Sequence, residues 1–257
     1  MNLRRIGVIA SNAFREVIRD RVLYLLGLFT LLLVLGSRLL PEVSSIAADK
    51  ILVDLGFGAI ALFALVITLF VGTGLVSKEV EKRTVFVLLS KPVSRAELIV
   101  GKHLGLTAVL AVLIAAMSGV YMLLLHLYEI AFSWETLAIV GLFLLLELSL
   151  LTAFALLFSL STGPLLATLL TLAIYVMGHL SPDVVKLAQL TDSEGLQQAV
   201  RSLYLVLPDL SLFNLRNDGA YNLLPATDIL VQTALYGLAY SVLLLLLTSI
   251  IFSKKEF

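Results

Sequence analysis

The stretch SKEVEKRTVFVLLSKPVSRAELIVGK occupies Ser77–Lys102 and lies between two long apolar runs. It carries six of the chain's 18 Lys and Arg residues. Almost everything on either side of it is apolar enough to lie in a membrane. A charged segment of this length between two membrane spans is therefore a candidate docking surface. The alternative is a solvated turn that only fixes topology.

The local pattern within this stretch predicts a helix, a break and a second helix. Glu79 precedes Arg83 by four residues, with the acid first, a spacing that stabilises a helix. The break is expected before Pro92, because the residue preceding a proline disfavours helical geometry. Ser94 and Glu97 match a capping box, so a new helix is expected to begin there and run into the next apolar segment.

Composition places the 257-residue chain among integral membrane proteins. Hydrophobic residues make up 60% of it and charged residues 14%, whereas soluble domains average about 45–50% and about 25%. Its mean hydropathy is +1.05. The absence of cysteine excludes disulfides and thiolate metal sites. No motif indicates nucleic-acid binding, and no metal or cofactor site is expected in the chain.

Hydropathy predicts an all-α protein that forms a single membrane domain over residues 1–257. About 20 apolar residues are needed for a helix to cross the hydrocarbon. Six spans are predicted, at residues 22–40, 55–76, 104–127, 136–160, 164–180 and 229–252.

Charge asymmetry predicts the orientation of these spans. The segments on the side of the termini (1–21, 77–103, 161–163 and 253–257) hold thirteen Lys and Arg residues. The opposite segments (41–54, 128–135 and 181–228) hold four. The positive-inside rule then places both termini and residues 77–103 in the cytoplasm. We expect a multi-pass protein of the inner (plasma) membrane.

Further helices are predicted outside the spans, before the first span and between the fifth and the sixth. Residues 1–21 place five arginines beside apolar residues at helical spacing, which predicts an amphipathic helix lying on membrane lipid. An ordinary basic flank is the alternative. In residues 181–228, helix starts are predicted at Ser181–Pro182–Asp183 and at Asp192 or Ser193, the second helix ending at Pro208. We read these as a re-entrant helical pair, with a small outer cap as the alternative.

Glu147 is the one ionisable residue predicted in the middle of a span. An acid at the bilayer centre costs about 2.5–3.5 kcal/mol, so it should face protein or water. It could serve a substrate path or a gate. The alternative is a structural helix–helix contact in which the carboxyl is protonated or hydrogen-bonded, with Ser149, Thr152 or a Ser or Thr of another span as partner. His103, His126 and His179 fall near predicted span ends, where anchoring at the interface is expected.

The sequence from Val76 to Lys102 resembles the loop between the second and third spans of type-2 ABC transporter permeases. The shared features are an acidic-basic cluster, a Thr, a Leu-rich turn, then Ser-x-Pro-x-Ser-Arg and Gly-Lys. Val85 departs from the pattern, because many relatives carry glycine or a small residue near the Thr. The resemblance implies a coupling helix that docks on a cytoplasmic ATPase subunit, through Glu79, Glu81, Arg83, Thr84, Leu88, Leu89, Ser90, Pro92 and Arg95.

The resemblance also implies a function and partners. The chain would be the membrane subunit of an ATP-driven transporter, an exporter by family, with two permeases and two ATPases per assembly. The second permease would be another copy or a close relative. No G-x-x-x-x-G-K-[ST] motif occurs, so ATP and Mg²⁺ are assigned to the partner and no catalytic residue is assigned here. An ion-gradient-driven transporter and an intramembrane enzyme are the alternatives.

Overall fold

The computed structural model describes residues 2–19, 23–43, 48–81, 94–130, 132–189, 207–221 and 223–254, with isolated positions between 195 and 204. All regular secondary structure in these ranges is helical, which confirms the predicted all-α class. The elements are α1 (Leu3–Val17), α2 (Leu23–Val43), α3 (Ala48–Glu81), α5 (Arg95–Leu127), α6 (Trp134–Ser161), α7 (Pro164–Gln189), η2 (Leu210–Phe213), α9 (Arg216–Ala220) and α10 (Thr227–Lys254).

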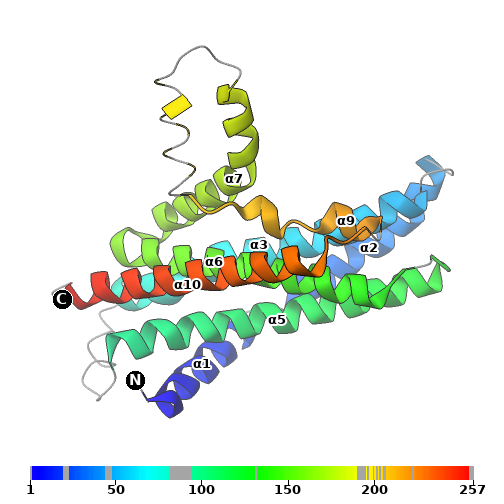
Figure 1. Cartoon of the computed structure of the whole chain (residues 1–257). Helices are drawn as coiled ribbons and strands as arrows, with labels where there is room; N and C mark the ends of the chain where they lie inside the picture. Colours follow the sequence, from blue (N-terminus) through cyan, green and yellow to red (C-terminus); the bar gives the residue numbers. More distant parts are fainter. Residues whose placement is uncertain are drawn as a thin grey trace.

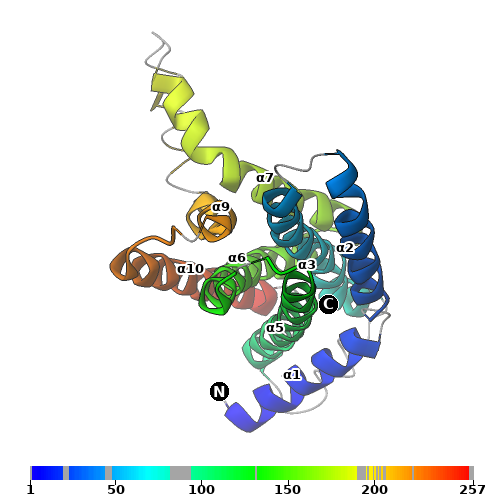
Figure 2. The same ribbon diagram turned by 90° about the vertical axis from the view of Figure 1, so that its right-hand side faces the viewer.

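The long helices form one bundle whose axes run roughly alongside one another (Figure 1). Seen from one end of the bundle, α3, α5 and α6 lie at its centre, with α2 and α10 on opposite sides (Figure 2). The two termini lie at the same end, and α5 begins at that end too (Figure 1). We call this the terminal end of the bundle. Helix α1 crosses α5 obliquely there.

Five helices in the described part of the chain are long and apolar enough to cross a membrane. They are α3, α5, α6, α7 and α10, which match five of the six predicted spans. The apolar stretch of α2, Tyr24–Leu39, is shorter than the others. The structure therefore supports five spans, and the first predicted span remains a prediction.

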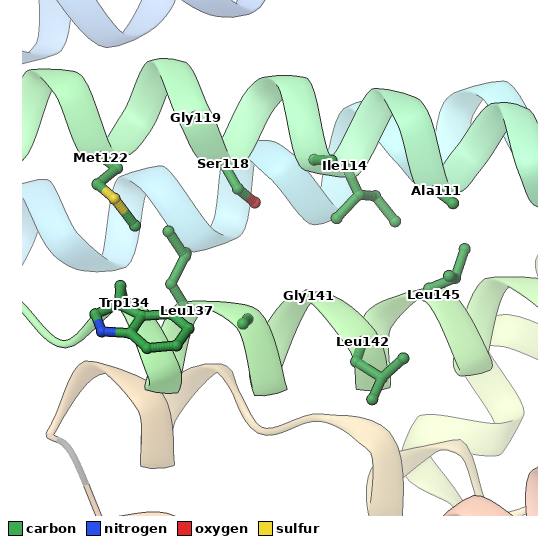
Figure 3. Close-up of a pocket in the computed structure, with 12 residues that line it drawn as sticks. Ala111, Ile114, Ser118, Gly119, Met122, Trp134, Leu137, Gly141, Leu142 and Leu145 are labelled. Carbon is green, nitrogen blue, oxygen red and sulfur yellow. The ribbon is translucent and has the colours of Figure 1, made fainter.

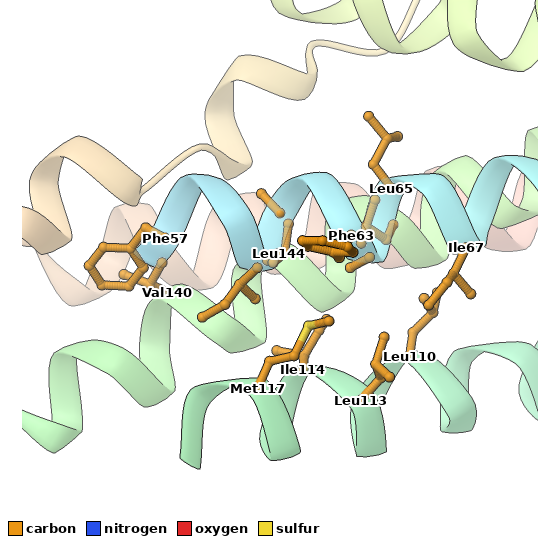
Figure 4. Packing of buried hydrophobic residues seen from close by; sticks show 14 of the residues in the cluster. Phe57, Phe63, Leu65, Ile67, Leu110, Leu113, Ile114, Met117, Val140 and Leu144 are labelled. Atoms are coloured by element: carbon orange, nitrogen blue, oxygen red, sulfur yellow. The ribbon is translucent and has the colours of Figure 1, made fainter. Parts of the chain in front are cut away.

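The core of the bundle is built by α3, α5 and α6, whose apolar side chains interdigitate (Figure 4). Phe57 of α3, Met117 of α5 and Val140 of α6 are all buried. Small residues permit close approach: a Cβ at Gly56 would lie 2.2 Å from the Tyr121 ring. The Tyr121 hydroxyl donates to the Val53 carbonyl at 3.1 Å, which satisfies a polar group that would otherwise be costly inside the bundle.

Helix α7 differs from the predicted fifth span. The expected helix start at Ser181–Pro182–Asp183 is wrong, because α7 continues through Pro182 to Gln189. Its outer part turns away from the bundle (Figure 1). Proline lacks only its own N–H and can be accommodated in a membrane helix when neighbouring groups satisfy the freed carbonyl.

The chain then returns to the bundle through the segment Leu207–Tyr221, which we call the return segment. It runs alongside the bundle (Figure 1) and contains η2, which packs on α6 and α7, and α9, which packs on α3 and α6. The isolated described positions between 195 and 204 are helical and Pro208 is not, which agrees with the predicted end of the second helix. Its predicted start at Asp192 or Ser193 lies outside the described residues.

Candidate functional site

The predicted coupling residues fall only partly within the described structure. Glu79 and Glu81 lie in the last turn of α3, which ends at Glu81. Six of the others lie outside the described residues: Arg83, Thr84, Leu88, Leu89, Ser90 and Pro92. The structure therefore shows the end of α3 and the start of α5 on either side of these six residues. Arg95 is the predicted coupling residue whose side-chain contacts are visible.

Helix α5 begins with a capping box formed by Ser94 and Glu97, which confirms the predicted helix start. The Ser94 hydroxyl accepts from the Glu97 N–H at 3.2 Å, and the Glu97 carboxylate accepts from the Ser94 N–H at 3.0 Å. The same carboxylate accepts from the backbone N–H of Asn2 at 2.7 Å. It also lies 4.0 Å from the Arg5 guanidinium. The first turn of α5 is thereby bonded to the start of α1.

Arg95 connects the same turn to the end of α10. Its guanidinium donates to the carbonyls of Phe252 and of Ser253, the latter at 3.1 Å, and lies over the Phe252 ring. The last carbonyls of a helix have no partners within it and carry the negative end of its dipole, so a cation is favoured there. We call Ser94, Arg95 and Glu97 with these partners the α5 junction.

Packing beneath the α5 junction joins four helices. A small apolar cluster combines α5, α6 and α10, with Ile9 of α1 packed against it; its buried members are Leu98, Ile99, Leu156, Leu160 and Phe252. A displacement of the first turn of α5 would therefore be passed to α1, α6 and α10 together, because close-packed interiors transmit strain.

Helix α1 sits unusually close to α5, at Gly101 and Gly105. A Cβ at Gly101 would lie 2.7 Å from the Ile9 Cβ, and one at Gly105 would lie 2.7 Å from both the Ala10 carbonyl oxygen and the Ala13 Cβ. This G-x-x-x-G spacing is the pattern that allows membrane helices to approach closely. The sequence predicted the amphipathic helix, but this crossing shows that its buried face contacts protein.

Glu147 is buried in the middle of α6, with 2% of its surface exposed. Its partners are not the Ser and Thr residues named as the structural alternative, since Thr152 donates to the Leu148 carbonyl and the Ser149 hydroxyl lies near His103 and Thr107. Its Oε1 lies 3.4 Å from Nε2 of His179 on α7. Arg216 of the return segment interacts electrostatically with Glu147 and hydrogen-bonds the Tyr175 side chain.

Sequence reasoning missed this cluster because its members are 32 to 69 residues apart along the chain, counted from Glu147 to His179 and to Arg216. It expected His103 and His179 to anchor at the interface. Both are instead directed into the protein, His103 towards the Ser149 carbonyl and His179 towards Glu147. The one available signal was that a mid-span acid requires a partner.

An open groove of about 450 Å³ runs between α5 and α6 (Figure 3). Ile114 and Met122 line one side, and Trp134 and Leu142 line the other. Ser118 and the Trp134 indole are its polar side chains. The groove is therefore a surface that suits hydrocarbon. No group of three or more potential metal ligands occurs among the residues that the structure describes.

Comparison with known families supplies a match over nearly the whole chain. The family described as "ABC-2 family transporter protein" matches residues 8–257. This range includes the first turn of α5, the close contacts of α1 with Gly101 and Gly105, and the Glu147 cluster. A search of curated proteins gives no match.

Proposed function

The chain belongs to the ABC-2 family of transporter proteins, and from this membership we propose that it is the transmembrane subunit of an ATP-driven exporter. In this proposal it forms the translocation path, and a separate cytoplasmic ATPase binds and hydrolyses ATP with Mg²⁺. The chain itself performs no catalysis.

The α5 junction is the observation that supports coupling through residues 77–103. A partner that displaces this segment moves the first turn of α5, because α5 begins at Arg95 within the segment, with Ser94 as its N-cap. Arg95 and Glu97 bond that turn to α10 and α1. A rigid-body movement of packed helices is a common way to convert partner contact into a change of state.

We also propose six spans with both termini in the cytoplasm of the inner membrane. The cation asymmetry supports this orientation. The two termini lie at the same end of the bundle, as an even number of crossings requires (Figure 1). Helix α2 would make the first crossing by tilting little and relying on its flanking residues to reach the interface.

A second copy of the chain, or a close relative, completes the proposed transporter. Only 22% of the apolar window of α7 and 28% of that of α10 are buried, against 67% in α3. The outer faces of α7 and α10 are therefore available to lipid or to another subunit. We place the contact at α2 and at the region from α7 to α10.

The coupling proposal is tested with single cysteines, which are clean probes because the natural chain has none. We expect Leu88→Cys or Ser90→Cys to cross-link to the ATPase in the assembled transporter. Removing two charges with Glu79→Gln and Arg83→Gln should leave the protein inserted, because both residues lie outside the predicted spans. It should weaken ATPase association or uncouple hydrolysis from transport, since interfacial charge pairs matter most when they are desolvated.

A matched control is the pair Asp183→Gln and Lys186→Gln, an exposed ion pair of α7 at 3.2 Å. It should leave ATPase coupling unchanged, because it lies far along the chain from residues 77–103. Transport that continues without ATP, together with no cross-link from residues 88 or 90, would replace the proposal with an ion-gradient-driven transporter.

A further inference from the structure

Glu147 of α6 and His179 of α7 form a buried pair of facing polar side chains. Oε1 of Glu147 and Nε2 of His179 face each other at 3.4 Å. Both atoms are buried, and neither has a hydrogen-bond partner in the described part of the chain. Two buried polar atoms in this position require a bridging group.

The other ring nitrogen of His179 decides which group that is. Its Nδ1 lies 3.0 Å from the Tyr175 carbonyl oxygen. A carbonyl only accepts, so Nδ1 must carry a hydrogen, and in a neutral imidazole Nε2 is then a bare acceptor. An ionised Glu147 is also only an acceptor. The two facing atoms can form a hydrogen bond only if one proton lies between them, on either the carboxyl or the imidazole.

The surrounding charges favour one proton rather than none or two. The charged groups that act on the pair come from the return segment: Arg216 interacts with both members and Asp209 with His179. Tyr175 on α7 is the neighbouring neutral titratable group. With one proton on the pair, the pair is neutral and Arg216 balances Asp209. Gain or loss of a proton would leave one uncompensated charge in the bundle, which is costly.

The pair lies where α7, α6 and the return segment meet. A Cβ at Gly178, beside His179, would lie 2.7 Å from Cγ of Leu210 and 3.0 Å from the Pro208 carbonyl oxygen. The outer part of α7 turns away from the bundle beyond this region (Figure 1). A hydrogen bond between Glu147 of α6 and His179 would therefore fix the position at which the outer part of α7 leaves the bundle.

We propose that Glu147 and His179 bind a single proton and that the loaded pair fastens α7 and the return segment to α6. When the proton leaves, two acceptors face each other and the helices separate or admit water. Above the ordinary histidine pKa of about 6.5, a hydrated, separated pair has an ionised Glu147 and a neutral His179, so the closed pair holds one more proton. Linkage therefore favours separation as the pH rises above this value, and closure is favoured most at and below it. This device does not depend on the ATPase.

The test measures the position of α7 directly in the full-length chain in lipid nanodiscs. Spin labels are placed at Leu142→Cys on α6 and Val184→Cys on α7, both exposed. The distance distribution between the labels is recorded from about pH 5 to about pH 9, a range that brackets the ordinary histidine pKa of about 6.5. We expect the population with the longer distance to grow as the pH rises.

Two variants decide whether the pair is responsible. Glu147→Gln supplies an amide N–H that donates to Nε2 without titrating, so the distance should stay short at every pH. His179→Gln also removes the shared proton. It replaces Glu147→Gln in the test if that variant inserts poorly into the membrane. Glu135→Gln, an exposed acid in the first turn of α6, should keep the full response. A natural chain without a pH-dependent shift, or a shift that persists in both pair variants, overturns the proposal.

Discussion

The substitution Gly105→Ala tests whether α1 is part of the bundle. The added Cβ would lie 2.7 Å from both the Ala10 carbonyl oxygen and the Ala13 Cβ, and 3.2 Å from the Ala10 Cα. Two of these atoms are backbone and the third is a Cβ, so no side-chain rotation relieves the overlap. Overpacking of this kind costs about 1–3 kcal/mol. The overlap exists only when α1 is packed on α5, so it destabilises the docked state of α1. It lowers the ratio of docked to undocked α1 by about 5- to 150-fold.

The assay is the rate at which a maleimide reacts with Ile6→Cys. Ile6 faces α5 and is 5% exposed, so its cysteine reacts mainly when α1 leaves α5, and the rate follows the population of that opened state. We expect Gly105→Ala to raise the rate by about 5- to 150-fold. The alanine also favours the helical state of α5 by about 1 kcal/mol, but this gain is the same whether α1 is docked or not.

Gly119→Ala is the matched control on the same helix. A Cβ there meets nothing within 4 Å, and it brings the same gain in helix propensity, so the labelling rate should not change. If Gly105→Ala reacts no faster than Gly119→Ala, the close crossing of α1 and α5 is refuted. The route proposed from the coupling segment to α1 would then rest on the contacts of Glu97 with Asn2 and Arg5.

Three further predictions follow from the junction, the core and the topology. Arg95→Gln removes charged donors worth about 1.5–3 kcal/mol from the last carbonyls of α10, so amide hydrogen exchange in the last turn of α10 should speed up at least about tenfold. Arg4→Gln, at an exposed position of α1, should not change it. Tyr121→Phe removes one buried hydrogen bond and should lower the free energy of unfolding by about 1 kcal/mol in a denaturant titration. Ser193→Cys should react with a membrane-impermeant maleimide added outside intact cells; a reaction of Ser90→Cys under the same conditions would contradict the proposed orientation.

The sequence by itself determined the all-α class, five of the six predicted spans and the helix start at Ser94 within the charged segment. Long apolar runs can satisfy their backbone groups in lipid only as helices, so hydropathy located α3, α5, α6, α7 and α10. The capping box at Ser94 and Glu97 is local chemistry over four residues, and the structure confirms it. Such features are readable because their causes lie within one turn or one span.

Tertiary structure decided the contacts that carry the proposals. Sequence reading took Pro182 as a helix boundary, but α7 continues through it. It offered Ser149 or Thr152 as partners of Glu147 and placed His179 at the interface, whereas the fold brings Glu147 and His179 to 3.4 Å. It also did not anticipate that Arg95 bonds the end of α10 or that Gly101 and Gly105 admit α1. These contacts join residues distant in the chain, and within an apolar bundle hydropathy is nearly the same on every face. Only the packing of one helix on another therefore selects which polar and small residues meet.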